Sequence, residues 1–289
     1  LDEAALMAKA PVPATTATGA VAPAAGGATV PTVHDEVFCF SLMVPFGCGA
    51  TCPPATATPS GQEYELVQLQ WSLQTSIFAC DSYAVYSNRT VQIADGLTTT
   101  AVDVDLTVKF GGDSYTALNS WIFIAVWKQV LDEGRHLTSN WIAKVDPDAV
   151  FFPDRLRPIL AAHAGAGYIN NCKFGLHGPI EVLSSKAMMT LQQDYDASWD
   201  KKAPAQCVKE LHFGQWGEDF FLSQCLWKVH GVERDLAPEL MCEAHCACDD
   251  WYWCQTAGAP VTYHPFKRPD MYRQCLANQM SGVSVTVAQ

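Results

Sequence analysis

The sequence predicts an α/β fold with a largely parallel central sheet that is stapled by disulfide bonds. Along residues 37–152, apolar runs and amphipathic stretches alternate in the order strand, helix, strand, strand, helix, strand. This alternation is typical of layered α/β domains. The 289 residues also include 12 cysteines. Their even number and scattered spacing favour disulfides in an oxidising compartment over zinc or iron–sulfur sites.

The first half of this pattern contains one predicted helix and three predicted strands. Residues 37–44 are all apolar except one serine, as expected for a strand buried on both faces. Residues 64–76 place leucines three and four positions apart, which indicates a helix. Residues 77–88 resemble a second buried strand. Residues 103–110 alternate apolar and polar side chains, which predicts a half-buried strand.

The later elements carry signals for helix starts and stops. A long amphipathic stretch ends at Gly134. Ser184 or Ser185 is suited to cap the helix that begins directly after these serines. The expected elements are a helix at 114–134, a strand at 140–152, a helix at 154–163, a strand at 166–172, a strand or turn and a helix at 178–195, and a helix within 214–231.

Composition and charge limit the function classes. Hydrophobic residues make up 49 % and charged residues 17 % of the chain, which excludes a disordered chain and a coiled coil. The 18 basic and 30 acidic residues give a net charge of −12, so nucleic acid is a poor partner and a cation a compatible one. The longest apolar stretch, 121–131, is interrupted by Lys128 and is far shorter than the ~20 residues of a membrane-spanning helix.

The chain divides into a tail and one domain. Residues 1–33 are rich in Ala, Pro, Thr and Gly without any period, which predicts a linker or stem, or a tail that wraps a protein partner. Residues 34–289 are expected to form a single α/β domain with a cysteine-rich insertion at 231–260. The glycosylation sequon at Asn88 agrees with a secretory route, and because the chain begins at Leu1 we expect an upstream targeting or anchor segment.

Two carboxylates follow the apolar half of the strand predicted at 140–152. In α/β sheets ligands bind beyond the carboxyl ends of the strands, and Asp146 and Asp148 are expected at that edge. Carboxylates two residues apart can face one Mn²⁺ or Mg²⁺, ions that prefer oxygen ligands. Such an ion would neutralise a diphosphate leaving group. A surface turn built around Pro147 is the alternative.

A second acidic pair and one histidine are further candidates. Glu218 and Asp219 begin a predicted helix, where the helix dipole favours carboxylates by ~0.3–1 kcal/mol. Their functional interpretation is a general base that accepts a proton from an attacking hydroxyl. His264 follows a short apolar strand and precedes a proline. It is either a metal ligand or a locally hydrogen-bonded side chain.

The late cysteines have the spacing C-x₃-C-x-C-x₅-C from Cys242 to Cys254 and enclose His245. This spacing does not match the usual zinc pairs, so disulfides are favoured and zinc remains open. The sequence lacks a G-x-S-x-G motif, a Walker A motif and a dinucleotide-binding glycine fingerprint, which excludes those classes.

In order, these segments resemble glycosyltransferases of the GT-A fold, most closely the fringe-like, β-3-sugar-transferring group. The resemblance covers residues 37–273. It implies an α/β/α sandwich and a metal-dependent, inverting transfer of a sugar from a nucleotide-sugar donor to a hydroxyl of a glycan or protein acceptor. The segments that carry it are "VFCFSLMV", "CDSYAVYSN", Asp-Pro-Asp, "GPIEVLSSKAMMTL", "WGEDFFLSQCL" and "YHPFK".

The resemblance also implies roles for single residues. Asp148 and His264 would bind Mn²⁺ (or Mg²⁺), and Asp146 would contact the ribose or the metal. Asp219, or otherwise Glu218, would be the base. Phe220 and Phe221 stand where the family has small or aliphatic residues, and the insertion at 231–260 has no counterpart.

The remaining implied contacts concern the donor and the acceptor. Asp81 would contact the nucleoside, and Trp216 would line the acceptor side. Basic residues for the diphosphate are scarce, with Lys144, Lys267 and Arg268 as candidates.

A rival hypothesis is a non-catalytic, glycosyltransferase-like binding or structural subunit of a larger, membrane-associated lumenal assembly. One distance separates the two hypotheses. Ligands of one Mn²⁺ lie within ~2.5 Å of a common point, so a separation beyond roughly 8 Å between the Asp148 carboxylate and the His264 ring would exclude a shared site.

Overall fold

The structure is a computed structural model that describes residues 36–46, 59–113, 115–255 and 259–280. The tail predicted at residues 1–33 lies outside these ranges, as do Cys48 and Cys52. In the described part of the chain, no helix combines the length and the apolar character that crossing a membrane requires.

A seven-stranded sheet forms the centre of the domain, in the order β12-β10-β11-β8-β1-β2-β5. β11 pairs antiparallel with both of its neighbours, and the remaining adjacent pairs are parallel. The prediction of a largely parallel sheet is therefore confirmed. The strands are β1 (Val37–Leu42), β2 (Ser82–Ser87), β5 (Thr100–Ala101), β8 (Trp141–Val145), β10 (Tyr168–Asn170), β11 (Ile180–Ser184) and β12 (Arg234–Leu236).

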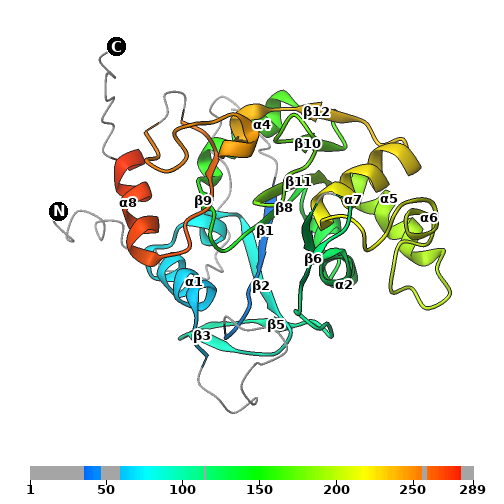
Figure 1. Cartoon of the computed structure of the whole chain (residues 1–289), viewed down its shortest axis with the longest axis horizontal. Helices are drawn as coiled ribbons and strands as arrows, with labels where there is room; N and C mark the ends of the chain where they lie inside the picture. The colour runs from blue at the N-terminus through cyan, green and yellow to red at the C-terminus, as the bar shows by residue number, and fades with distance from the viewer. Residues whose placement is uncertain (1–35, 47–58, 114, 256–258, 281–289) are drawn as a thin grey trace, which may run out of the picture. The chain divides into compact units, whose positions relative to one another are not determined.

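Helices cover both faces of the sheet (Figure 1). Alternate residues of a strand point to opposite faces, so Phe38 and Phe40 pack on one helical layer and Val37 and Cys39 on the other. One layer contains α2 (Ser120–Asp132), α5 (Ser185–Asp196), α6 (Ala205–Glu210) and α7 (Glu218–Gln224), and the other contains α4 (Pro153–Ala162). This arrangement is an α/β/α sandwich.

A small second sheet in the order β13-β14-β9 lies over a separate apolar core. Its strands are β13 (Met241–Cys242), β14 (Thr262–Tyr263) and β9 (Val150–Phe151). The helices α1 (Gln62–Leu73) and α8 (Pro269–Met280) contribute Leu66 and Tyr272 to this core. The small sheet joins the cysteine-rich insertion to the segment that follows β8.

The remaining described elements are one helix, two hairpins and four short helices. The helix is α3 (Arg135–Thr138). The hairpins are β3 (Gln92–Ala94) with β4 (Leu97–Thr98) and β6 (Lys109–Gly111) with β7 (Thr116–Leu118), and the short helices are Ser76–Ala79, Cys225–Val229, Pro238–Leu240 and Ala244–Cys246.

Three predicted elements differ from the structure. The strand predicted at 77–88 begins with a 3₁₀ turn, because Cys80 is joined to Cys39 of β1 and the chain enters β2 only afterwards. The strand predicted at 103–110 is irregular up to residue 108, where Val104 and Leu106 pack on the core without a partner strand and Val108 is exposed. The strand predicted at 140–152 is broken by the Asp-Pro-Asp turn into β8 and β9, which belong to different sheets.

Among the described residues, ten cysteines form five disulfides, which confirms the prediction of a stapled domain. Disulfides of this number indicate an oxidising compartment. The pairs are Cys39–Cys80, Cys172–Cys246, Cys207–Cys225, Cys242–Cys248 and Cys254–Cys275.

Candidate functional site

The Asp-Pro-Asp turn leaves the central sheet at the carboxyl end of β8. The backbone N–H of Asp146 donates to the carbonyl of Pro179 at 3.1 Å, and the N–H of Ala149 donates to the carbonyl of Asp146 at 3.0 Å. These bonds hold the turn so that the chain continues into β9. Asp146 and Asp148 therefore lie where ligands bind in parallel sheets, as the sequence predicts.

The register of the small sheet brings His264 to this turn. Tyr263 pairs with Val150 and with Cys242, so the next residue, His264, lies between Asp148 and Glu243. Its Nε2 is 3.4 Å from Asp148 Oδ1, and its Nδ1 is 3.2 Å from Glu243 Oε2. Donor atoms of Asp146, Asp148 and His264 all lie within 4.8 Å of one another. The three predicted metal ligands are thus close enough to share one ion.

The cluster borders an open pocket of about 270 Å³. Four carboxyl groups reach this pocket, together with the ammonium of Lys267, which is exposed. An anionic diphosphate would meet strong repulsion here unless a cation accompanied it. The polar lining residues are Glu63, Asn119, Asp146, Asp148, Glu218, His264 and Lys267.

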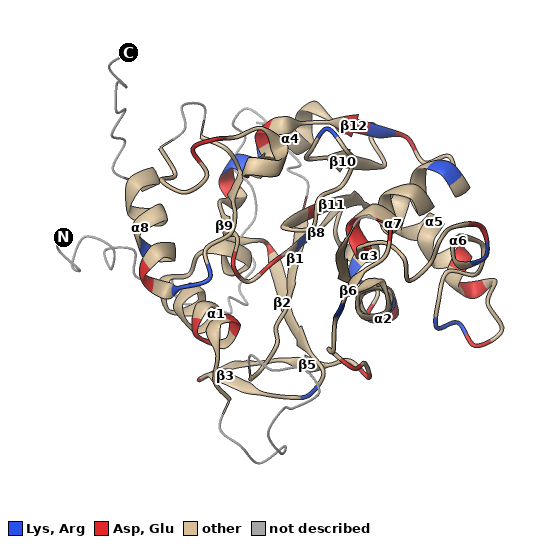
Figure 2. Cartoon of the chain, in the orientation of Figure 1, with Lys and Arg blue, Asp and Glu red and all other residues tan. Residues whose placement is uncertain are grey.

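Lys144 has a different place from the one predicted. Its side chain is 1 % exposed and its Nζ lies 2.8 Å from both Asp146 Oδ1 and Glu218 Oε1. The ammonium also donates to the carbonyl of Gly178 at 2.6 Å and lies over the ring of Phe123. Its three N–H groups are thereby used within the protein, so Lys144 does not contact a diphosphate. Figure 2 shows basic and acidic ribbon segments close together near β8.

A third carboxyl group, that of Glu181, belongs to this buried group. Glu181 pairs with Lys144 across β11 and β8, and its Oε1 is 3.8 Å from Lys144 Nζ. Burial, and then the charge of Glu218, raise the pKa of Glu181 well above its ordinary value. Burial lowers the pKa of Lys144, but Asp146, Glu218 and Glu181 raise it by more, so the ammonium stays charged.

The two candidate bases differ in their surroundings. Asp219 Oδ2 accepts from the N–H of Gly178 at 3.0 Å and lies 3.5 Å from His177 Nδ1, while Oδ1 accepts from its neighbour's N–H. Burial raises the pKa of Asp219, but His177 lowers it by more. Glu218 lines the pocket, and its Oε2 has no hydrogen-bond partner among the described residues. Burial raises the pKa of Glu218, and the positive charge of Lys144 lowers it by less, so the pKa is raised overall.

The histidines of the site are held by carboxylates. Burial lowers the pKa of His264, but Asp148 and Glu243 raise it by more, to about 9. The same balance, with Asp219 and Glu243 as partners, raises the pKa of His177 to about 10. Burial raises the pKa of Asp148, and the contact with His264 lowers it by more.

Three predicted residues lie apart from the cluster. Asp81 accepts from the N–H of Val37 and is paired with Arg157, so it lies at the opposite end of β1 from the pocket and the predicted nucleoside contact does not fit this position. Trp216 donates to Asp113 at 2.9 Å and packs on the aromatic residue four positions later. Asn88 follows β2 and is half-buried.

Several site residues have no clear sequence signal. Glu243 and His177 lie in loops more than 60 residues apart, yet they are 2.8 Å from each other. Glu63 belongs to the first turn of α1, where acidic residues are common, and Arg268 pairs with Asp270 instead of reaching the pocket. Glu181 alone carries a signal, because an ionisable residue inside an apolar strand is unusual.

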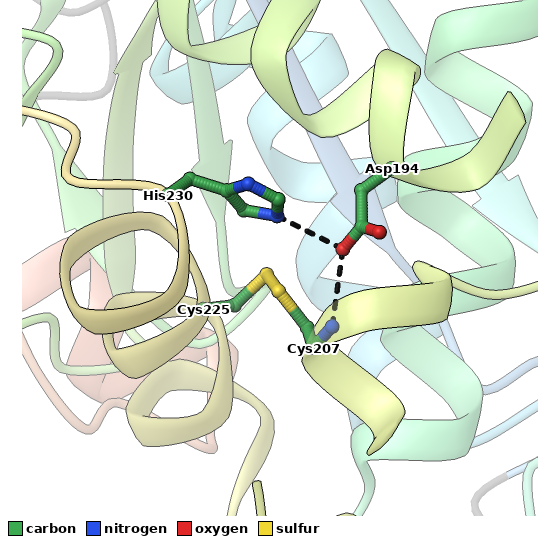
Figure 3. A group of neighbouring side chains, drawn as sticks. All are labelled: Asp194, Cys207, Cys225 and His230. Atoms are coloured by element: carbon green, nitrogen blue, oxygen red, sulfur yellow. Dashed lines mark hydrogen bonds and ion pairs between the residues drawn. A yellow bond between two sulfur atoms is a disulfide. The ribbon is translucent and has the colours of Figure 1, made fainter. Parts of the chain in front are cut away.

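A further group of potential ligands is structural. Figure 3 shows His230 and Asp194 beside Cys207 and Cys225, whose sulfur atoms are bonded to each other. Sulfur atoms in a disulfide are not thiolates and do not bind zinc. Asp194 accepts from His230 Nε2 at 2.9 Å and from the backbone N–H groups of Gln206 and Cys207, which fixes the start of α6.

Replacing Lys144 tests its role as the buried counter-charge. We expect K144M to lower the free energy of unfolding by about 3–5 kcal/mol, because it leaves buried carboxylates unpaired. Urea denaturation at neutral pH measures this. The control, K128M, removes the half-exposed ion pair with Asp132 on α2 and should cost less than about 1 kcal/mol. Equal losses in the two variants would contradict the role of Lys144.

Glu63 makes stability depend on pH. Burial, and then the nearby charges of Asp148 and Asp146, raise its pKa from 4.5 to about 8 in spite of the hydrogen bond from Val44. A pKa that is higher in the folded than in the unfolded state gives stability below pH 4.5 that is lost as the pH rises through about 8.

We therefore expect the free energy of unfolding to fall less between about pH 5 and about pH 9 in E63Q than in the wild type. E65Q, an exposed position on the same helix, should follow the wild type. Chemical denaturation across this range measures the effect, and identical pH profiles for all three proteins would show that Glu63 does not titrate in this window.

Comparison with known proteins leaves the family open. No family model and no curated protein matches the chain. One matching solved structure is a cytidylyltransferase from Leptospira borgpetersenii serovar Hardjo-bovis (strain JB197), with a TM-score of 0.36 and 9 % identity over 88 % of this chain and 98 % of that chain. Another is a glycosyltransferase involved in the glycosylation of the major capsid of PBCV-1, with a TM-score of 0.36 and 11 % identity over 72 % of this chain and 84 % of that chain. Neither description names the fringe-like group.

Proposed function

We propose that the protein transfers a sugar from a nucleotide-sugar donor to a hydroxyl acceptor and that it requires a divalent metal ion. One observation carries this proposal. Asp146, Asp148 and His264 meet within 4.8 Å at the carboxyl ends of parallel strands, beside a pocket that also contains Glu218. Metal ligands and a further carboxylate that lines the same pocket are the groups that such a reaction needs.

The ligand set fits Mn²⁺ or Mg²⁺. Two carboxylates and one imidazole offer mostly oxygen donors, which these ions prefer. In the absence of an ion, the charge of the two aspartates is balanced by Lys144 and by the proton on His264. When bound, the ion supplies positive charge that neutralises the diphosphate of the leaving group.

The pocket itself contributes the contacts to the donor. Lys267 is exposed at its rim and is placed to pair with a phosphate oxygen. Apolar side chains of Leu42, Val44 and Ile122 line the remaining wall and exclude water from the reacting atoms. The pocket therefore combines an apolar wall with a few polar groups, as small-molecule sites usually do.

Glu218 is the carboxylate best placed to act as the base. Its N–H donates to Asn119 Oδ1 at 2.9 Å, and one carboxylate oxygen is held by Lys144. The other oxygen, Oε2, is buried and turns into the pocket to accept the proton. In the proposed step, the acceptor hydroxyl loses its proton to Glu218 and its oxygen forms a bond to the anomeric carbon. The bond between that carbon and the diphosphate oxygen breaks, and the electron pair leaves with the nucleoside diphosphate. This displacement inverts the anomeric centre.

The same function gives roles to Asp219 and Trp216, the two predicted residues that flank Glu218. Asp219 then positions the start of α7 through Gly178 and His177 rather than acting as the base. Trp216 extends an aromatic surface beside α7 on which an acceptor sugar could stack. A lumenal or secreted location and a glycan at Asn88 agree with the disulfides and with the sequon.

The metal requirement is tested with D148N. We expect the wild type to turn over nucleotide sugars from a panel only when Mn²⁺ is present. D148N should lower the turnover rate by at least about 100-fold, because losing a direct metal ligand costs at least as much as losing one of its outer partners. Release of nucleoside diphosphate measures turnover. The control is D95N, an exposed aspartate in a turn.

The same assay separates the two hypotheses for the protein. Equal turnover by D148N and D95N would contradict the metal site. A wild-type protein that binds Mn²⁺ and the donor but releases no nucleoside diphosphate with any acceptor would indicate the rival, non-catalytic subunit.

The base is tested with E218Q and D219N. We expect E218Q to lower kcat by about 10²–10⁴-fold with little change in KM, as for loss of a general base. D219N should lower kcat less, because its carboxylate is already used by the backbone and by His177. Steady-state kinetics measures both variants, and a larger loss of kcat in D219N would assign the base to Asp219 instead.

A further inference from the structure

A second group of metal-binding side chains lies next to the pocket but does not line it. Donor atoms of His177, Glu243 and His245 lie within 4.8 Å of one another. We propose that these three residues bind a late first-row divalent ion, for which zinc is the reference, at a site separate from the ion of the pocket.

The donor atoms have nearly the spacing that zinc needs. His177 Nε2 is 2.8 Å from Glu243 Oε2, and His245 Nδ1 is 3.3 Å from Glu243 Oε1. Zinc binds imidazole nitrogen and carboxylate oxygen at about 2.0–2.2 Å in a tetrahedron, so two of its donor atoms are about 3.4 Å apart. Small side-chain rotations therefore suffice to seat the ion.

The outer contacts of His177 also resemble those of a metal ligand. Its second nitrogen, Nδ1, lies 3.5 Å from Asp219 Oδ2. A carboxylate on the far nitrogen of a metal-binding histidine keeps a proton there, so the ion replaces only the proton that the near nitrogen shares with Glu243. Asp219 is itself fixed by the N–H groups of Gly178 and Phe220.

Two disulfides hold the three ligands in place. Cys172 and Cys246 join the loop that carries His177 to the turn that carries His245. Cys242 and Cys248 close a short loop around Glu243 and His245, and the carbonyl of Glu243 accepts from the N–H groups of Cys246 and Cys248. A site of this kind is preorganised by covalent bonds, so ion binding requires little ordering of the backbone.

The donor sets of the two sites differ in chemistry. Two imidazoles and one carboxylate favour zinc and related ions, whereas the pocket offers two carboxylates and one imidazole, which suit Mn²⁺ or Mg²⁺. The side chain of His245 is 78 % exposed, so an ion can enter from solvent. Three protein ligands leave at least one position for water.

The test isolates this site by removing the other. Glu243 Oε2 also contacts His264 Nδ1, so the two sites share a wall and all measurements are made in the D148N background. The full chain is stripped with a chelator and dialysed against Zn²⁺, and bound zinc is measured by mass spectrometry. D148N/H245N is compared with D148N/H212N, in which an equally exposed histidine that also pairs with a carboxylate is replaced.

We expect D148N and D148N/H212N to bind one equivalent of zinc and D148N/H245N to bind it at least about tenfold more weakly. Cobalt in place of zinc should give the visible absorption of a tetrahedral ion only where His245 is present. Equal zinc affinity in the two double variants, or no zinc bound by D148N/H212N, would overturn the proposal. Because D148N already removes the metal site of the proposed transferase, failure here is distinct from failure of that function.

Discussion

The buried ammonium of Lys144 is the interaction on which the rest of the site depends. It lies at the carboxyl end of β8, where Asp146, Glu218 and Glu181 converge from three separate segments. Carboxylates so close together in an apolar layer would repel one another and lose their hydration. Lys144 offsets this cost, and the raised pKa of Glu181 favours the neutral form of that carboxyl group. Asp146 and Glu218 can then both line the pocket.

The small sheet has the second decisive role. Its three strands come from the end of the Asp-Pro-Asp turn, from the cysteine-rich insertion and from the segment before α8. Their register places His264 between Asp148 and Glu243. The disulfide Cys172–Cys246 ties the same insertion to the loop of His177. The cysteine-rich insertion at 231–260 thus contributes Glu243, which contacts His264 of the site.

Local patterns in the sequence were sufficient for much of the fold. The buried strand at Val37, the helix capped by Ser184 and the position of Asp146 at a strand end follow from neighbouring residues and are present in the structure. The failures have a common cause. Whether the segment at 103–110 pairs, and whether residues 140–152 remain in one sheet, depends on partners that are distant in the sequence.

For this protein, the sequence by itself determined the layered α/β class, the disulfide-rich character and the candidate ligands Asp146, Asp148 and His264. The class and the disulfide-rich character depend on composition and on the periodicity of nearby side chains, whereas the three ligands are what the family resemblance implied. Only the tertiary structure decided that Lys144 is a buried counter-charge, that Asp81 lies at the far end of the sheet, and that His177 and Glu243 adjoin the pocket. Strand order and register set those contacts, and they join residues that local sequence patterns cannot relate to one another.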